Sequence, residues 1–443
     1  MRKVTKILLR ILSAIVLLLI ILPLLPALLL SIPTVQNAVI DKAADWAGNK
    51  LGTQVSVGHI TIGLLNRVAV RDFYVADWDN DTLLYVKRAD VYLNSLASLT
   101  KKNLIINYGN IQGGKFVVRE TERGTFAVKE ITDQLVKERE NSGFRLDVRS
   151  LDGSDIDFSL LRIDDPDDGG IDFANMHLLG MNTHIDDLLV KSGGHVAGDI
   201  RRLSFVERSG FALDDMSGHF LVDNGQIEIK DGLLKTVLSE INLDYLLLDG
   251  KDWLEYRDFI NKIPIICNVT DSRVSSDDVG YFATTIWGWQ TTVRDASISM
   301  DGTVSNFKGK IQHATLEDGG TLRGSAHVRG LIDIENTRFD IDVDKLKAST
   351  EEITYLLNTI AHLSLGESAT QYVERIKNVD ASGEFRGTIR DFKAKAKANL
   401  ASGGDVELEC SMLNPAEGRK GVKAVVSADN TDIGALLANE LFG

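Results

Sequence analysis

Most of the chain after residue 53 alternates apolar and polar residues with a period of two. In RFDIDVDKL, from Arg338 to Leu346, the residues Phe339, Ile341 and Val343 fall on one side of an extended chain, with aspartates on the other. Such alternation is typical of a strand with one dry and one wet face. It recurs in QVSVGHITIG, NGQIEIKDG, DASISMDG and DVELECSML, separated by Asp-Gly, Asn-Gly and Gly-Gly turn signals. The pattern predicts a mainly β protein whose sheet is elongated, repetitive and antiparallel.

The apolar positions of these strands are the candidate ligand-contacting residues. A sheet with one dry face must meet a second layer, close on itself or hold something apolar. About 25 strands at ~4.8 Å spacing would span roughly 120 Å as one sheet, which must curl. The sequence leaves two forms open, a filled sandwich and an apolar groove suited to acyl chains. The candidates are Ile227, Ile229, Ile298, Met300, Phe339, Ile341, Val343, Val406, Leu408 and Met412.

Helical patterns are few after residue 53, at about 129–140, 351–363 and 367–377. The second of these begins with STEE, in which Ser349 and Glu352 form the pattern of a capping box. These short helices are too scarce to cover the predicted sheet.

Two segments resemble each other beyond composition. GTVSNFKGKIQHATLEDGG begins at Gly302 and GTIRDFKAKAKANLASGG at Gly387, an offset of 387 − 302 = 85 residues. Both place a strand between the G-T start and a Gly-Gly turn, and a second strand follows. The similarity indicates a stacked supersecondary unit. Two hairpins that merely share turn chemistry are the alternative.

The N-terminus is the strongest single signal. Arg2, Lys3, Lys6 and Arg10 precede an almost wholly apolar run, long enough to cross a hydrocarbon core of ~30 Å. The cations favour a cytoplasmic N-terminus, with the rest of the chain on the far side. The run predicts a membrane anchor that two prolines kink; a cleaved signal peptide is the alternative. The candidate anchor residues are Ile11, Val16, Leu19, Pro23, Pro26 and Leu30.

The segment from 32 to 52 has helical spacing. Val35, Val39, Ala43 and Trp46 recur on one side, and Gly52 stands where a helix commonly stops. We expect an amphipathic helix just outside the membrane, with its dry face either on the sheet or on lipid head groups.

Composition restricts the partners and the chemistry. With 63 acidic and 49 basic residues the formal net charge is −14, which argues against a nucleic-acid partner. The alternating FKAKAKA near residue 395 is better interpreted as the wet face of a strand. Cys267 and Cys410 have no metal-ligand spacing; a disulfide between them stays open.

Sequence motifs for chemistry are weak. DWDNDT, from Asp77 to Thr82, imitates the start of a calcium loop but lacks its glycine and its bidentate glutamate. DDPDDGG, from Asp164 to Gly170, is typical of an acidic hairpin loop. His177 and His184 lie seven residues apart without a zinc motif. Trp287 and Trp289 occupy alternate positions on one predicted strand face, and they fit a core or groove wall better than a sugar platform. We predict no cofactor, no metal and no catalytic residue; an acidic pair of the glycosidase kind is the enzymatic alternative.

The order of these elements resembles the AsmA-like superfamily of bacterial envelope proteins, and within it the TamB-type translocation and assembly proteins. A membrane span leads into IPTVQNAVIDKAADWAGNKLGTQVSVGHITIG, and the strand DTLLYVKRADVYL follows. IRRLSFVERSGFALDDMSGHF and LLKTVLSEINLDYLLLDG are similar to the middle part of such chains. The resemblance covers most of the chain at modest specificity and is strongest over about 1–115 and 195–250.

The resemblance implies an organisation and a location. Residues 1–31 would be the cytoplasmic tip and single-pass anchor in the bacterial inner membrane, and 32–52 the amphipathic helix. Residues 53–250 would form the N-terminal β region, and 251–443 the β-groove repeats with short helices at about 351–377. The body would lie in the periplasm.

The resemblance also implies a function. Such proteins hold phospholipid in a long β groove, move it toward the outer membrane and support outer-membrane biogenesis. TamB-like chains are far longer and end in a β domain that meets an outer-membrane barrel protein, so we expect a short relative or an incomplete piece. The alternative is a structural module that assists outer-membrane protein insertion through strand edges, without lipid transport.

Overall fold

The computed structural model shows a mainly β protein with a few short helices. It describes residues 42, 44, 45, 48 and 49, and 52–429 with gaps at 64–65, 78, 96–102, 121–144, 162–169, 173–174, 192–194, 252–254, 283, 332–335, 356–377, 401–403 and 414–420. Contacts divide the chain into two units, one formed by 1–167 and 172–212 and the other by 168–171 and 213–443. The predicted boundary after residue 250 falls between two paired strands of the second unit.

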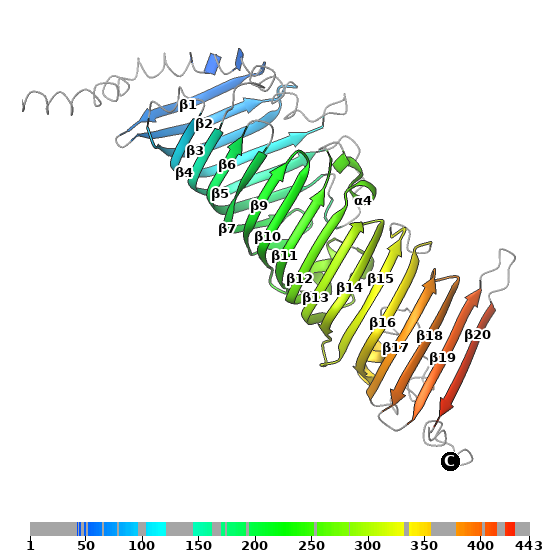
Figure 1. The fold of residues 1–443 in the computed structure, drawn as a ribbon. Helices are drawn as coiled ribbons and strands as arrows, with labels where there is room; N and C mark the ends of the chain where they lie inside the picture. Colours follow the sequence, from blue (N-terminus) through cyan, green and yellow to red (C-terminus); the bar gives the residue numbers. More distant parts are fainter. Residues whose placement is uncertain are drawn as a thin grey trace, which may run out of the picture. The chain divides into compact units, whose positions relative to one another are not determined.

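The first unit contains seven long strands, in the blue to green part of Figure 1. Strands β1 to β4 pair antiparallel in chain order, as do β5 to β7. Strands β4 and β5 pair in parallel, and the connection between Arg119 and Arg145 exceeds the dozen residues that a parallel crossover needs. The strands are β1 Val55–Ile62, β2 Arg67–Ala76, β3 Thr82–Leu93, β4 Asn103–Arg119, β5 Arg145–Leu161, β6 His177–Lys191 and β7 His195–Glu207.

A small hydrophobic core lies among the first strands of the first unit. Val75 and Leu83 are 5% exposed, and Val55, Phe73, Leu84 and Phe116 pack against them. Phe116 also contacts Phe158 with 5.8 Å between the ring centroids. The period-two strands predicted from QVSVGHITIG onward are therefore confirmed. The short strand β8, Ala212–Leu213, lies at the boundary of the two units.

The second unit is an antiparallel succession of strands, each paired with the next along the chain (Figure 1). Two-residue and other short turns join most of them, as the Asn-Gly and Gly-Gly signals predicted. The strands are β9 Asp215–Asp223, β10 Gln226–Lys235, β11 Glu240–Asp249, β12 Ile265–Ser275, β13 Thr292–Thr303, β14 Asn306–Thr315, β15 Thr321–Arg329, β16 Arg338–Ser349, β17 Asn378–Gly387, β18 Phe392–Leu400, β19 Asp405–Leu413 and β20 Gly421–Asp429.

The sequence repeat corresponds to a repeated three-strand unit. Gly302, the second-to-last residue of β13, lies opposite Phe307, and Gly387, the last residue of β17, lies opposite Phe392. Both glycines have positive φ, 128° and 134°, and a Cβ on either would lie within 3 Å of the backbone of the returning strand. Because only glycine fits there, both hairpins need the same residue. Strands β13–β15 and β17–β19 repeat the arrangement, and equivalent hydrogen bonds run from the Leu316 N–H to the Gly320 carbonyl and from the Leu400 N–H to the Gly404 carbonyl.

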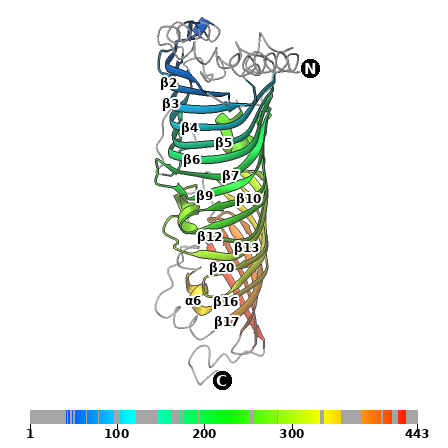
Figure 2. The ribbon, with the colours of Figure 1, turned by 90° about the vertical axis from the view of Figure 1, so that its left-hand side faces the viewer.

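Short helical segments lie at the ends of strands of the second unit. They are η2 Glu255–Asp258, α4 Phe259–Lys262, α5 Ser276–Gly280, η3 Thr284–Ile286 and α6 Thr350–Tyr355. Figure 2 shows α6 beside β16. The predicted capping box is confirmed, since the Ser349 N–H donates to Glu352 Oε2 at 2.9 Å and the Glu352 N–H donates to Ser349 Oγ at 3.2 Å.

Several predicted elements lie outside the described residues. They are the anchor over 1–31, most of the helix over 32–52, the helices at 129–140 and 367–377, and the second half of 351–363. Lys42, Ala44, Asp45, Gly48 and Asn49 are helical. Among the residues that the structure does describe, no helix is long and apolar enough to cross a membrane.

Candidate functional site

The second unit gathers apolar side chains from all of its strands on one face of the sheet. We call this the apolar face and define it by residues that lie opposite one another in consecutive strands. Its central row contains no polar side chain other than two thiols. The row is Phe220, Ile229, Leu246, Cys267, Met300, Gly309, Ala326, Ile341, Phe385, Ala394, Cys410 and Ala424.

Rows on either side of the central row are also apolar. One runs Val222, Ile227, Leu248, Ile265, Gly302, Phe307, Val328, Phe339, Gly387, Phe392 and Met412. The other runs Gly232, Leu243, Val269, Ile298, Ile311, Gly324, Val343, Gly383, Ala396, Leu408 and Val426. Rows of this kind run across the strands, so a hydrocarbon chain laid along them meets no charged group.

The structure places all ten candidate ligand-contacting residues on this face. Ile229, Met300 and Ile341 lie in the central row, and six of the others lie in the two rows beside it. Val406 belongs to a fourth row, in which Ala314, Leu322, Leu346, Ala381, Ala398 and Val406 lie opposite one another in turn. Four sequence stretches that are far apart along the chain therefore contribute to one surface.

Sequence reasoning missed the intervening strands of the face. Strands β17 and β18 contribute Ala381, Gly383, Ala394 and Ala396, whose small side chains hide the alternation. The signal was present in FKAKAKANL, where the lysines were assigned to the wet face and the alanines between them mark the dry one. A strand whose dry residues are Ala and Gly reads as polar by hydropathy alone.

Within the described residues, no second sheet packs on the apolar face. Each strand has substantial contacts only with its neighbours in the sheet, with α4 against β13, α5 against β12 and α6 against β16. Residues of the central row are consequently half-buried, except that Ala424 on the last strand is exposed. Complete burial is confined to positions near strand ends and bends such as Ala296, Ala314 and Ala348. The face is thus shielded by its own neighbouring side chains rather than by a facing layer.

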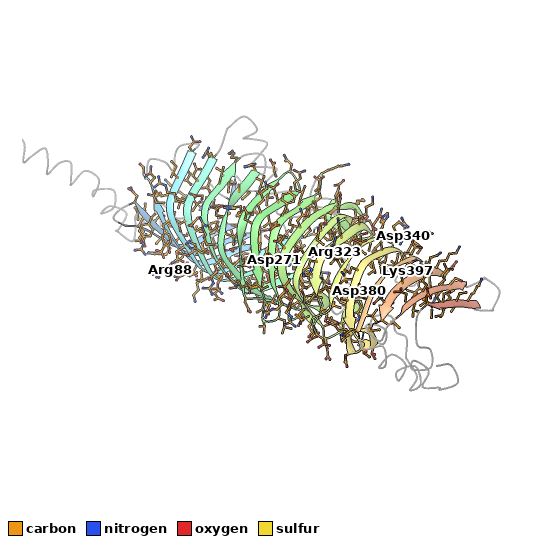
Figure 3. All side chains as sticks on the ribbon, turned by 60° about the horizontal axis from the view of Figure 1, so that its bottom comes forward. Arg88, Asp271, Arg323, Asp340, Asp380 and Lys397 are labelled. Atoms are coloured by element: carbon orange, nitrogen blue, oxygen red, sulfur yellow. The ribbon has the colours of Figure 1, made fainter. Side chains whose placement is uncertain are left out.

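The opposite face of the sheet is charged. Asp340, Asp380 and Lys397 mark it on β16, β17 and β18 in Figure 3. Lys395 Nζ lies 2.7 Å from Glu409 Oε1, and Lys397 Nζ lies 2.5 Å from Glu407 Oε1. The interpretation of FKAKAKA as a wet strand face is therefore confirmed, because two of its lysines pair across the strands with glutamates.

A shallow depression of about 640 Å³ lies on this charged face. Lys308, Lys310, Asp340, Asp342 and Arg386 line it, among others. The Arg386 guanidinium pairs with Asp342, and this hydrogen bond raises the pKa of Arg386. Because cations and anions neutralise each other within the depression, it presents no charge of one sign to a ligand.

The two cysteines are free and remote from each other. Cys267 lies on β12 and Cys410 on β19, seven strands further along the central row. At ~4.8 Å per strand they are roughly 34 Å apart, far beyond the reach of a disulfide. The open possibility of a pairing within one chain is therefore excluded. Burial raises the pKa of the Cys267 thiol.

The acidic motif that begins at Asp77 stabilises a turn. The carboxylate of Asp77, 2% exposed, accepts the N–H groups of Asp79 and Asp81 at 3.0 and 2.8 Å, which closes the loop before β3. Apart from Gly170, the DDPDDGG stretch lies outside the described residues. Nowhere in the described ranges do three or more His, Cys, Asp or Glu side chains gather as metal ligands would.

The two histidines considered as zinc ligands, His177 and His184, lie in the first unit. His177 Nδ1 is 3.2 Å from Ser159 Oγ, whereas His184 Nδ1 is 2.6 Å from Asp152 Oδ1. The Tyr108 hydroxyl donates to Asp152 Oδ2 at 2.6 Å, which raises the pKa of Tyr108 to about 12 and lowers the pKa of Asp152. These groups bridge β4, β5 and β6 and stabilise their parallel and antiparallel pairing.

Trp287 and Trp289 do not share a strand face, contrary to the prediction. They follow η3 in a turn, in which Trp287 is 43% exposed and Trp289 is half-buried. Trp287 contacts the Tyr281 ring edge-on, at 6.2 Å between centroids. Trp289 lines a cavity, so the expected role as a wall applies to it alone.

Comparison with known proteins gives no match: no family model, no curated protein and no solved structure is similar to this chain.

Proposed function

We propose that the apolar face of the second unit binds the hydrocarbon chains of phospholipids. The observation that supports this proposal is a face of twelve described strands, apolar in three adjacent rows, on which no second layer packs in the described residues. Leaving such a face in water is unfavourable by ~25 cal/mol per Å². A surface of this extent marks an interaction site, and a flexible hydrocarbon chain matches its continuous shape.

Bulges interrupt many of the strands that form this face. Register shifts occur between β9 and β10 and in every pair from β11 to β17, and bulges of this kind bend a strand and increase its twist. We propose that the bends curl the sheet of the second unit into an apolar groove. Eleven strand intervals at ~4.8 Å give it a length of about 50 Å, so several chains fit in succession.

We propose a cellular role on the basis of the apolar N-terminal run and of the resemblance to AsmA-like and TamB-type proteins. Residues 1–31 would anchor the chain in the bacterial inner membrane with the body in the periplasm. The groove would then carry phospholipid toward the outer membrane and support its biogenesis, with an outer-membrane barrel protein as a further partner. The apolar run and the family's element order support this role.

Lipid extraction tests the binding proposal. We expect the purified full chain to carry more than one phospholipid molecule, measured by mass spectrometry of organic extracts against a detergent-matched control protein. Ile341→Asp places a carboxylate in the middle of the central row, between Ala326 and Phe385. It should reduce the phospholipid per chain about tenfold, because a charge on the track loses its hydration.

The matched control introduces the same carboxylate on the other face. Ser325 lies next to Ala326 in β15, is exposed, and faces Asp342. Ser325→Asp should leave the bound phospholipid unchanged. Wild-type preparations that are folded and free of lipid, or equal losses in both variants, would refute the proposal.

A second candidate function uses the edge of the sheet. In the described residues β20 pairs only with β19, and Val425 and Val426 are 46% and 64% exposed. An exposed edge is a template for another chain's strand, as an assembly factor for outer-membrane proteins would need. If the edge of the sheet is the functional site, Val425→Pro should abolish cross-linking to a client strand and leave the bound lipid unchanged. If the apolar face is the functional site, Ile341→Asp should remove the bound lipid and leave cross-linking unchanged.

A further inference from the structure

A cavity of about 560 Å³ lies at one end of the apolar face, among strand ends and three short helical segments. Helices α5 and α6 and the η3 turn contribute side chains to it, as do the ends of β12, β13 and β15. Its volume is that of an ordinary small-molecule site. It is separate from the central row, none of whose residues line it.

The walls of the cavity are apolar. Val279 comes from α5, Ile286 from η3, and Trp289 from the turn that follows, while Val293, Leu316 and Leu322 come from β13 to β15 and the turn between. Leu322 lies opposite Leu346 and Ala314, so the wall continues into the fourth row of the apolar face. An unbranched hydrocarbon chain would bury its surface against these six side chains.

The rim of the cavity is acidic. Glu317, Asp318, Glu351 and Glu352 line it, and no Lys, Arg or His does. Glu352 is 5% exposed and structural, because its carboxylate accepts the N–H groups of Asp318, Gly320 and Ser349 at 3.1, 3.0 and 2.9 Å. The other three carboxylates are exposed to solvent.

Lys347 and Arg294 lie near this rim. Lys347 Nζ is 3.8 Å from Asp380 Oδ2 on the neighbouring strand, and Lys347 does not line the cavity. Arg294 donates to the backbone carbonyl of Glu317 at 2.6 Å and does not line the cavity. The loop from Leu316 to Gly320 is held by the Leu316 N–H to Gly320 carbonyl bond at 2.8 Å and by Glu352. The three exposed carboxylates are therefore held on a fixed loop and helix end around an apolar opening.

We propose that this cavity binds one hydrocarbon chain of an amphiphile whose head group carries a positive charge. The apolar walls take the chain, and the carboxylates of Glu317, Asp318 and Glu351 attract a cationic head and repel an anionic one. This site goes beyond the phospholipid face, because it lies in different residues and selects ligands by the charge of the head group.

Matched amphiphiles test the selection. Dodecyltrimethylammonium and dodecyl sulfate share a twelve-carbon chain and differ in head charge. Below their micellar concentrations, calorimetric titration of the full chain should give an affinity for the ammonium at least about tenfold higher than for the sulfate. Equal affinities, or a preference for the sulfate, would overturn the proposal.

Charge reversal locates the site. Glu317→Lys with Glu351→Lys should invert the preference between the two amphiphiles. The control variant, Asp301→Lys with Asp344→Lys, makes the same change of net charge at two exposed residues that do not line the cavity. It should keep the preference; loss of the preference in both variants would show that bulk charge alone attracts the ammonium.

Filling the cavity tests the chain-binding part. Leu322→Trp should abolish ammonium binding. Val279→Phe, on the short helix α5, should have the same effect and replaces the first variant if that variant does not fold. Ile341→Asp lies outside the cavity and should leave ammonium binding intact. A protein that binds the ammonium but no phospholipid would support this site and reject the proposed function, so the two proposals fail separately.

Discussion

Two segments of the second unit's sheet share one apolar face but differ in regularity. In the bulged segment, β9–β16, register shifts interrupt nearly every strand pair. In the regular segment, β17–β20, no pair has a shift. Figure 3 shows the difference, since the green and yellow strands curve whereas the orange and red ones run straighter. Bulges, rather than composition, decide where this sheet bends.

Side-chain size follows this division only in part. In the central row the bulged segment carries Ile229 and Met300 but also Gly309, and the regular segment carries Phe385 beside Ala394. On the charged face the regular segment is held by direct cross-strand pairs such as Lys395 with Glu409. The comparison teaches that one alternating pattern supports both geometries.

The largest expected effect separates the two segments in the fourth row of the apolar face. Ala314 on β14 and Ala398 on β18 both lie in that row, and Ala314 is 2% exposed while Ala398 is half-buried. Ala314→Asp should lower the free energy of unfolding by about 3 kcal/mol, because the bend excludes water from the new charge. Ala398→Asp should lower it by about 1 kcal/mol. Urea unfolding followed by circular dichroism measures both, and equal losses would contradict the difference in burial.

The hairpin glycines should behave alike in both segments. Gly302→Ala and Gly387→Ala each force a Cβ into a left-handed position within 3 Å of backbone atoms, at a cost of about 2 kcal/mol. Gly421→Ala, where a Cβ meets nothing within 4 Å, is the neutral control. Thermal unfolding compares the three; a loss at only one of the two hairpins would mean that the repeat is not structural.

A smaller effect tests the bulges themselves. Asp271 has φ 40° at a register shift between β12 and β13. Asp271→Val should destabilise by about 1.5 kcal/mol, because a β-branched side chain resists positive φ, and Asp271→Gly should be neutral or slightly stabilising. Asp380→Val, in the regular segment, should change the melting temperature little. A similar loss at both aspartates would assign the effect to the lost carboxylate instead.

The smallest effect concerns two carboxylates on the charged face. The hydrogen bond from Lys395 lowers the pKa of Glu409, and the one from Lys230 lowers the pKa of Glu228, which also accepts from the Tyr245 hydroxyl at 3.1 Å. Lys395→Met should return the pKa of Glu409 most of the way to its ordinary value, because only the attraction of Lys423 remains, whereas Lys230→Met should leave the pKa of Glu228 lowered by the Tyr245 hydrogen bond. Carbon-detected NMR titration of the two carboxyl groups measures this.

The sign of the pH dependence follows from these directions. A pKa lowered by folding stabilises the folded state above the pKa of the unfolded chain, and the stabilisation is lost as pH falls through the folded pKa. Acid should therefore weaken the β18–β19 pairing in the wild type more than in Lys395→Met. An unchanged Glu409 pKa in that variant would show that the pair does not form in solution.

Local sequence information was sufficient for the strands with large apolar residues, for their faces and for one helix start. RFDIDVDKL alternates because neighbouring side chains on a strand point to opposite faces, so period two alone places Phe339, Ile341 and Val343 together. The capping box of Ser349 and Glu352 needs only residues three apart, and the 85-residue repeat identified two equivalent hairpins. Such features depend on nearest neighbours along the chain.

Tertiary structure alone decided what those strands form together. The order of pairing brings Ile229, Met300 and Ile341 into one row, and the bulges at Asp231, Asp271 and Asp295 carry no sequence signal that separates them from other aspartates. The cavity among α5, η3 and α6 collects residues from Val274 to Tyr355, and the Trp287 and Trp289 turn broke the expected alternation. The physical reason is that pairing register, bulge position and cavity shape depend on contacts between residues far apart in sequence, whereas alternation and capping depend on neighbours.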